Sequence, residues 1–187
     1  MKIIGITGTN GSGKGTVAQM LVAKLNLEHV SARDIIINYA KESGIDITDR
    51  VSMNKFSEKN NLEGWSVFGG FIKENLGSDK IYLLESIRRV KEIKEIRSFD
   101  LPSIIISIDA DIETRFERIL GRKSSTDNLD FQKFKDEEEM ENKAEEDNQM
   151  NLSKCIDLVD FKFENNSNVE NLERQIDKMI KKFPDFF

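Results

Sequence analysis

The sequence has few of the residues that disulfide frameworks, metal centres and membrane spans require. Its 187 residues include one cysteine, Cys155, and one histidine, His29. A single cysteine excludes an internal disulfide, and these two residues are too few for a zinc site. We expect Cys155 to behave as a small buried apolar side chain. No apolar run approaches the roughly 18 residues that a bilayer-spanning helix needs.

Basic side chains are also in the minority. The chain has 28 Lys and Arg against 34 Asp and Glu, a formal net charge of -6. Such a surface is a poor partner for a nucleic-acid polymer, although a few arginines can still converge on a small anion. The first apolar segment is too short for a signal-peptide core. We therefore expect a cytoplasmic protein, monomer or homodimer, that binds neither membranes nor nucleic acid.

Strand and helix patterns alternate along the chain. Short apolar, β-branched runs predict five strands, at residues 2–7, 29–31, 81–84, 103–108 and 158–163. Apolar residues at helical spacing predict helices after each of them, over residues 14–25, 35 to about 44, 90–96, 112–120 and 169–180. This alternation predicts one α/β domain over residues 1–187, with a parallel sheet covered by helices on both faces. Residues 121–150 are polar, with an acidic run from Asp136 to Asp147.

A glycine-rich segment joins the first strand to the first helix. It consists of Gly8, Thr9, Asn10, Gly11, Ser12, Gly13, Lys14, Gly15 and Thr16. A strand, this spacing of glycines, a lysine and a helix in register are typical of a P-loop, or Walker A motif. Its amides and the helix N-terminus would surround the phosphates of ATP, and Lys14 would contact the β- and γ-phosphates.

The P-loop resembles that of adenylate kinase and related nucleoside monophosphate kinases, because Gly15 takes the place of the usual hydroxyl residue and Thr16 follows. The resemblance implies a three-layer P-loop NTPase fold with a helical lid. It also implies Mg²⁺ held largely through water, with ATP as co-substrate. Landmarks of the same family follow in order across most of the chain.

The next landmark is the segment from Ser31 to Asp34, which resembles the start of the family's acceptor-binding helix. Arg33 replaces the family's glycine, and Ile37 replaces an arginine that follows. The resemblance implies an acceptor-binding insert at about residues 33–77, with Arg33, Asp34 and Arg50 near the acceptor. A solvated surface arginine is the alternative for Arg33. Trp65 and Phe68 lie in the same region, either against a nucleobase or in the core.

The third strand ends in an acid, Glu85, followed by Arg88 and Arg89. Ligands bind along the carboxyl edge of a parallel sheet, and a carboxylate there can order water on Mg²⁺. By resemblance, Glu85 is a Walker B-type acid that acts with Thr16, and Arg88 contacts the acceptor phosphate. The alternative for Glu85 is the N-cap of a helix or an acid in its first turn.

The segment from Arg118 to Arg122 resembles the adenylate kinase sequence that leads into the lid. The resemblance places Arg118 over the adenine, Arg122 on the ATP phosphates and a lid at about residues 122–150. A surface helix paired with Glu113 and Glu117 is the alternative. No arginine occurs between Lys123 and Glu173, so Lys123, Lys133, Lys135 or Lys143 would have to replace the lid arginines. We expect the acidic run to be a solvated face.

The last strand and its Asn turn resemble dephospho-CoA kinase. In that fold the turn passes near the adenine, which implies that Asn165 or Asn166 contacts it. An Asn turn that caps the final helix is the alternative. Three functions remain open: an ATP-dependent kinase of a (deoxy)nucleoside monophosphate, a dephospho-CoA kinase, and a nucleotide-binding regulator or switch ATPase without an acceptor. The missing lid arginines support the third.

Overall fold

A five-stranded parallel sheet forms the centre of the molecule. The computed structural model describes residues 1–45, 64–121, 130–141, 146–147 and 149–187, apart from the side chains of residues 137, 140 and 141. The strands are β1 (Lys2–Gly8), β2 (Glu28–Ser31), β3 (Ile81–Glu85), β4 (Ser103–Asp109) and β5 (Phe161–Glu164). Their order is β2-β3-β1-β4-β5, and every neighbouring pair is parallel. The α/β fold with five parallel strands is confirmed.

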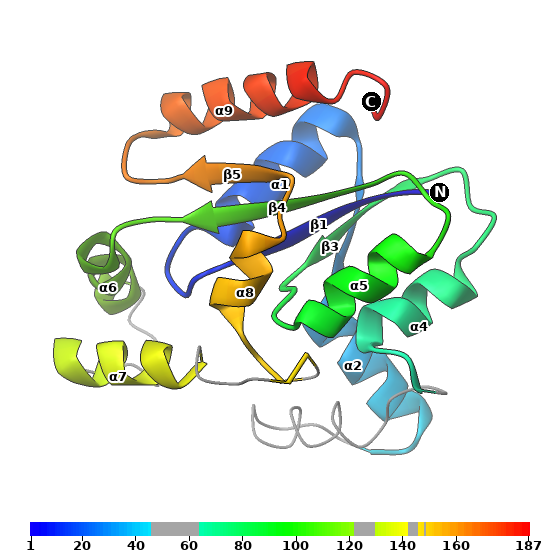
Figure 1. The fold of residues 1–187 in the computed structure, drawn as a ribbon, viewed down its shortest axis with the longest axis horizontal. Coiled ribbons are helices and arrows are strands. Elements are labelled where there is room, and N and C mark those ends of the chain that lie inside the picture. The colour runs from blue at the N-terminus through cyan, green and yellow to red at the C-terminus, as the bar shows by residue number, and fades with distance from the viewer. Residues whose placement is uncertain (46–63, 122–129, 142–145, 148) are drawn as a thin grey trace.

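Helices cover both faces of this sheet (Figure 1). The helices are α1 (Lys14–Leu25), α2 (Ala32–Glu42), α4 (Val67–Glu74), α5 (Val90–Ser98), α6 (Ile112–Gly121), α7 (Phe131–Glu141), α8 (Leu152–Asp157) and α9 (Val169–Lys182). Figure 1 shows α1 and α9 on one side of the sheet and α4, α5 and α8 on the other, with α6 and α7 beyond the end at which β4 and β5 terminate. No helix among the described residues is long and apolar enough to cross a membrane.

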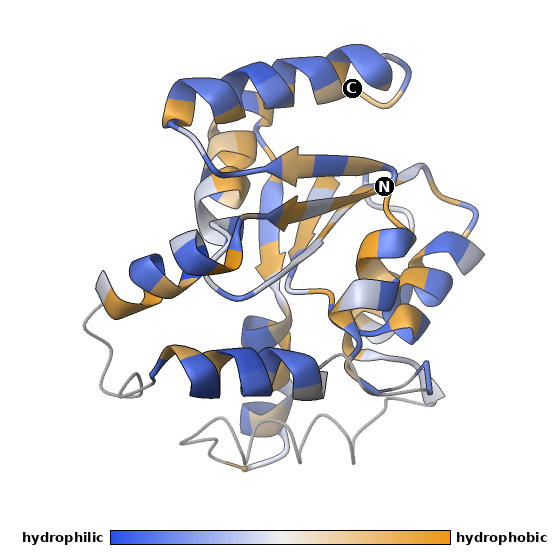
Figure 2. Cartoon of the chain, turned by 60° about the vertical axis from the view of Figure 1, so that its left-hand side comes forward, coloured by the Kyte–Doolittle hydropathy of each residue, from blue (hydrophilic) through white to orange (hydrophobic). Residues whose placement is uncertain are grey.

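The three central strands, β3, β1 and β4, divide their apolar side chains between two cores. Successive side chains of a strand point to opposite faces, so Ile4 and Ile6 pack against α1 and α9, whereas Ile3 packs with α4 and α5. The same alternation separates Ile106 from Ile105 on β4. The central strands are accordingly largely hydrophobic in Figure 2. Burial on both faces is the reason that these strands read as continuous apolar runs.

The edge strand β5 is covered by a side chain from α9. Glu164 N donates to Gln175 Oε1 at 3.0 Å, and Gln175 Nε2 donates to Glu164 O at 2.8 Å. The amide of Gln175 thereby takes the position that a further strand would occupy. Such pairing protects an edge from association with another chain.

The last strand begins later than the sequence predicted. Leu158 was expected in the strand, but its amide donates to Cys155 O and ends α8, and β5 begins only at Phe161. Helix α8 was not predicted. Asn151 caps it by accepting from Lys154 N at 2.9 Å. Cys155 lies on α8 and is fully buried, as predicted.

Candidate functional site

The P-loop leaves β1 and enters α1 as the sequence predicted. Gly11 and Gly13 have φ values of 79° and 92°, a region that favours glycine. Lys14 Nζ donates to Gly8 O at 2.9 Å and Thr9 O at 2.7 Å, which holds the ammonium group against the loop. Gly15 and Thr16 are exposed at the start of α1. The backbone donors of this helix start therefore face a space that a phosphate can enter.

The turn after β5 holds the P-loop from the side. Asn165 is buried, and its Nδ2 donates to Ser12 O at 2.8 Å. A Cβ on Gly13 would lie 2.4 Å from the same Nδ2, so glycine is required there by close approach as well as by its φ value. Asn165 N donates to Asp109 O at 2.8 Å, which ties the turn to the end of β4. The P-loop is thus packed against the last strand.

Arg118 extends this contact toward α6. Its Nη2 donates to Asn165 O at 2.8 Å. Its Nη1 is buried, and no hydrogen-bond partner reaches it among the described residues. Ser12 Oγ is also buried and has no hydrogen-bond partner among the described residues. Unpaired buried polar atoms are costly, and two of them beside a P-loop are consistent with a site that a polar ligand completes.

The neighbouring Asn166 has a different role from Asn165. Its Oδ1 accepts from Asp111 N at 2.7 Å, which joins the turn to the start of α6. The cap of the final helix is Asn168, whose side chain accepts from Asn171 N at 3.1 Å. The alternative that Asn165 or Asn166 caps this helix is therefore wrong, because the helix begins at Val169 and its cap lies two residues after Asn166.

Glu85 lies at the carboxyl end of β3 and faces the P-loop helix. A Cβ on Gly15 would lie 4.0 Å from Glu85 Oε1, so this carboxylate borders the space that the glycine leaves open. Its other oxygen, Oε2, lies 2.8 Å from Nε2 of His29 on β2. The N-cap of α5 is Arg89 and the acid in its first turn is Glu92, so the alternative assigned to Glu85 is wrong.

The residues around Gly15 fit a cation bound mainly through water. Glu85 offers one carboxylate oxygen toward the open space, and Thr16 is exposed beside it. Among the described residues, no three His, Cys, Asp or Glu side chains form a group that could hold a metal ion directly. Mg²⁺ retains several waters and takes few carboxylates in phosphate sites, so a single acid is a suitable complement.

The loop that carries Arg88 is held by a buried acid. Glu92 Oε2 accepts from Arg88 N at 2.9 Å and from Arg89 N at 3.1 Å, and Glu92 Oε1 accepts from Arg89 Nη1 at 3.4 Å. Burial raises the pKa of the Glu92 carboxyl, while the Arg89 charge and the two amides oppose this rise. Ser86 has a φ of 79°, which turns the chain sharply after Glu85. The Arg88 side chain is half-buried in this loop.

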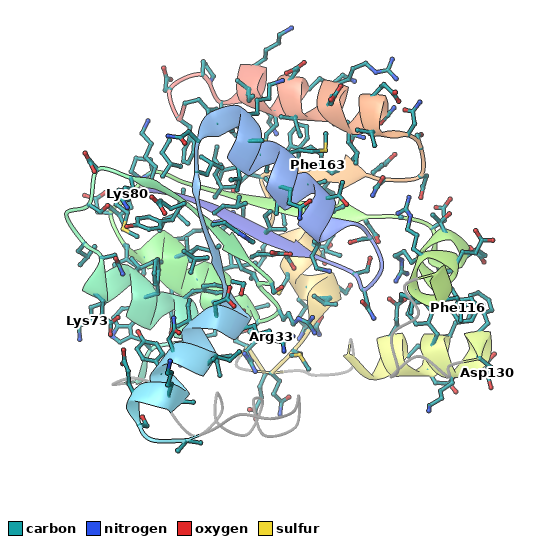
Figure 3. All side chains as sticks on the ribbon, turned by 180° about the vertical axis from the view of Figure 1, so that it is seen from behind. Arg33, Lys73, Lys80, Phe116, Asp130 and Phe163 are labelled. Atoms are coloured by element: carbon teal, nitrogen blue, oxygen red, sulfur yellow. The ribbon has the colours of Figure 1, made fainter. Side chains whose placement is uncertain are left out.

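Arg33 and Asp34 lie at the first turn of α2, directly after β2. Both side chains are exposed, and Figure 3 shows Arg33 at the end of α2 that adjoins the sheet. Ser31 caps the helix by accepting from Asp34 N, and Ser31 Oγ donates to Asp34 Oδ2 at 2.7 Å. These residues lie at the same edge as Glu85, which pairs in register with Ser31.

Other candidates are placed elsewhere or not described. Arg50, Arg122, Lys123 and Lys143 lie outside the described residues. Lys133 is exposed on α7, and Lys135 Nζ lies over the Phe131 ring at 4.5 Å. Phe68 is fully buried, and Trp65 packs on Phe99 with ring centroids 5.1 Å apart. Of the two alternatives for the aromatic pair, the core is the one that these contacts support.

Several side chains that hold these loops were not predicted from the sequence. They are His29, Glu92, Asp109, Arg115 and Glu138. Asp109 Oδ1 accepts from Thr9 Oγ1 at 2.6 Å, and Arg115 Nη2 donates to Glu138 Oε2 at 2.8 Å. Glu138 lies in the acidic run, so the expectation of a purely solvated face is wrong at this residue. Asp109, at the end of a predicted strand, carried a positional signal, since strand ends meet at this edge.

The sequence matches a known domain family and is similar to proteins of other organisms. The family model described as AAA domain matches residues 7–134. A UPF0200 protein of Methanocaldococcus jannaschii is 29% identical over 185 residues, which cover 97% of this chain and 90% of that protein.

Three solved structures share the fold. TT1252 from Thermus thermophilus has a TM-score of 0.63 at 19% identity, with 96% of each chain covered. Shikimate kinase from Bacteroides thetaiotaomicron has a TM-score of 0.62 at 10% identity, over 97% of this chain and 98% of that one. A gluconokinase from Sinorhizobium meliloti 1021 has a TM-score of 0.55 at 13% sequence identity, with 97% of this chain and 95% of that chain covered. Two of these proteins are kinases. The fold is that of the P-loop kinases, as the resemblance to the nucleoside monophosphate kinase superfamily predicted.

Proposed function

Since the chain belongs to the AAA domain family and folds like the P-loop kinases, we propose that it is an ATP-dependent phosphotransferase whose acceptor is a (deoxy)nucleoside monophosphate. The observation that carries the proposal is the position of Glu85 beside the P-loop helix. The Lys14 ammonium group lies on the P-loop carbonyls of Gly8 and Thr9, and Glu85 Oε1 borders the space that Gly15 leaves open at the carboxyl edge of the sheet. A triphosphate and its cation need opposite charges in such a space.

Lys14 and the amides of residues 8–16 would hold the β- and γ-phosphates. Mg²⁺ bound with ATP would neutralise charge between these phosphates, and Thr16 and Glu85 would hold its water ligands. The Nη1 of Arg118 is buried without a hydrogen-bond partner in the part of the chain that the structure describes. This supports a role for the side chain at the nucleotide, next to the turn of Asn165 and Asn166. The side chain and carbonyl of Asn165 are used within the protein, so its role would be to support the loop.

The acceptor would lie on the other side of the transferred group. Arg88 lies on the loop after β3 and Arg33 in the first turn of α2, both at the carboxyl edge of the sheet. We assign them, with Arg50 and Asp34, to the acceptor phosphate and its surroundings. Residues 33–77 would form the acceptor-binding insert. Residues 122–150 would form the lid, with Arg122 reaching the ATP phosphates. Phosphoryl transfer depends mainly on in-line positioning and charge stabilisation, so no covalent intermediate on the protein is needed.

A screen of acceptors tests this function. Purified protein, ATP and Mg²⁺ would be incubated with each nucleoside and deoxynucleoside monophosphate, and ADP release would be followed by a coupled assay. We expect one or a few monophosphates to accelerate ADP release well above the rate without acceptor. If no monophosphate does so, this acceptor class is wrong.

A hydroxyl acceptor is the second candidate. Shikimate kinase and gluconokinase share the fold and are named for acceptors that are not nucleotides. Asp34 is exposed at the start of α2, where a base for a hydroxyl group would be needed. Dephospho-CoA, shikimate and gluconate belong in the same screen, and ADP release with one of them alone would favour this candidate. Tight nucleotide binding with no response to any acceptor would favour a regulator or switch ATPase.

A further inference from the structure

Arg115 on α6 is a buried cation that the proposed mechanism does not use. It is 5% exposed. Its Nε donates to Ala110 O at 2.8 Å, and its Nη1 donates to Asn10 O at 3.3 Å. Asn10 lies at the apex of the P-loop; we use the word apex for residues 9–12 of this loop. One guanidinium group therefore fixes both the start of α6 and the apex of the phosphate loop.

The same guanidinium group binds an acid of another helix. Nη1 and Nη2 form a bidentate ion pair with Glu138 of α7, and Nη2 lies 2.8 Å from Glu138 Oε2. The Glu138 side chain is 17% exposed, so both partners are largely removed from water. A planar fork suits this double contact, because guanidinium presents parallel donors to two carboxylate oxygens.

Aromatic packing places α7 so that this contact can form. Phe116 of α6 lies against Phe131 and Phe134 of α7, with ring centroids 5.1 and 5.7 Å apart. Phe134 is 2% exposed, and the Arg115 guanidinium lies over its ring at 5.7 Å. Figure 3 shows Phe116 close to Asp130, which immediately precedes α7.

The backbone of Arg115 also touches the P-loop. A Cβ on Gly11 would lie 2.6 Å from Arg115 O, so the loop rests directly on this turn of α6. Thr9 is tied to the same region through Asp109, whose Oδ1 lies 3.8 Å from Arg115 Nε. The apex is thus supported by α6, and α6 is joined to α7 by the Arg115–Glu138 ion pair as well as by the packing of Phe116.

We propose that Arg115 is a positioning residue that couples helix α7 to the apex of the P-loop, so that the contact with Glu138 raises the affinity for nucleotide. The inference rests on the proposed function only in taking the P-loop as the nucleotide site. In the orientation in which it pairs with Glu138, the guanidinium group also reaches Asn10 O. Without the carboxylate, the buried cation turns toward other acceptors or water, and the apex loses its support.

Two neighbouring substitutions on α7 provide the first test. ADP affinity would be measured by titration calorimetry for the wild-type chain, Glu138→Gln and the matched control Glu139→Gln, whose side chain is exposed. We expect Glu138→Gln to weaken ADP binding by roughly 2- to 30-fold, the range for residues that couple sites without touching the ligand. Glu139→Gln should bind as the wild-type chain does. Equal affinities for the two variants would overturn the coupling.

A charge swap separates coupling from simple stabilisation. The double variant Arg115→Glu with Glu138→Arg restores an ion pair between α6 and α7, but a glutamate at position 115 cannot donate to Asn10 O. We expect it to melt at a higher temperature than Arg115→Glu alone while its ADP affinity stays low. Recovery of full ADP affinity in the swap would show that the pair only joins the helices, and would overturn the proposal.

Arg115→Lys tests the coupling between α7 and the P-loop if the other variants do not fold. Lysine keeps the charge but lacks the fork that contacts both Asn10 and Glu138, so ADP affinity should again fall. Wild-type affinity in this variant would contradict the proposal. A wild-type chain that binds no ADP would refute the proposed function itself, whereas wild-type binding with unaffected variants refutes the coupling alone.

Discussion

His29 Nε2 lies 2.8 Å from Glu85 Oε2, so the sole histidine of the chain orients the carboxylate that faces the P-loop. The two side chains come from neighbouring strands, and the register pairs His29 with Leu83, two residues before Glu85. The contact occupies one carboxylate oxygen and leaves the other beside Gly15. Hydrogen bonds of this kind orient groups that act on a metal and its waters.

We predict that His29→Ala raises the Mg²⁺ concentration needed for half-maximal activity by about 10-fold, the lower end of the range for groups that orient metal ligands. His29→Gln, which keeps a donor, should show a smaller rise. The thermal unfolding midpoint should change little, because a partly exposed pair contributes about 1 kcal/mol at most. Activity would be measured across Mg²⁺ concentrations at saturating ATP, and an unchanged Mg²⁺ profile in His29→Ala would contradict the assignment.

Lys14→Ala should lower turnover by at least about 100-fold, since a charge that stabilises the transferred group is lost. The fold should persist, because the hydrogen bonds from the lysine to Gly8 O and Thr9 O stay within the P-loop. Lys24→Ala is the matched control, because Lys24 lies in the last turn of the same helix and pairs with Asp177 at the surface. Steady-state rates and circular dichroism of both variants test this. Similar rates for the two would remove Lys14 from the mechanism.

Asn165→Asp should weaken ADP binding, because a carboxylate cannot donate to Ser12 O and would face that carbonyl oxygen across 2.8 Å. Asn166→Asp should be nearly neutral, since its oxygen accepts from Asp111 N and an aspartate still accepts. Calorimetry with ADP compares the two variants. Equal ADP affinities of the two variants would show that the hydrogen bond from Asn165 to Ser12 does not support the P-loop.

Glu92→Gln should be tolerated better than Glu92→Ala. The glutamine oxygen can still accept from Arg88 N and Arg89 N, whereas alanine leaves these amides without that acceptor, at a cost of about 1–3 kcal/mol for each buried group. Urea unfolding of both variants at one pH provides the comparison. An alanine variant as stable as the glutamine variant would contradict it.

The pH dependence of stability follows from the raised pKa of Glu92. A carboxyl whose pKa is higher in the folded state stabilises the fold fully below its unfolded pKa, and this contribution is lost as pH rises through the folded value. The wild-type chain should therefore lose more stability than Glu92→Gln between about pH 5 and pH 8. Urea unfolding at these two pH values measures the difference. If both proteins lose the same free energy of unfolding, ionisation of Glu92 does not cause the loss.

Cys155 should not react with thiol reagents in the folded protein. It is fully buried, and burial raises the pKa of its thiol to about 12, with the Glu92 charge adding to the rise. Reaction with a disulfide reagent at pH 8 should be at least about 100-fold slower in buffer than in denaturant. Rapid labelling in buffer would show that α8 opens readily from the core.

Much of the fold follows from local pattern. The runs at Lys2–Thr7 and Ser103–Ile108 are buried on both faces, and their β-branched side chains predict central strands on that ground. The P-loop could be predicted because all its special positions lie within nine consecutive residues. Helix α8 and the late start of β5 could not, since the Asn151 cap and the Leu158 amide depend on which neighbours the chain meets.

The sequence by itself determined the alternation of strands and helices and the position of the phosphate loop, because both arise from spacing along a short stretch of chain. Only the tertiary structure decided which distant side chains support that loop. His29 meets Glu85 across 56 residues and Asn165 meets Ser12 across 153. Such pairs are set by strand order and helix packing, and a single sequence contains no periodicity that reports which two remote positions will come within hydrogen-bond distance.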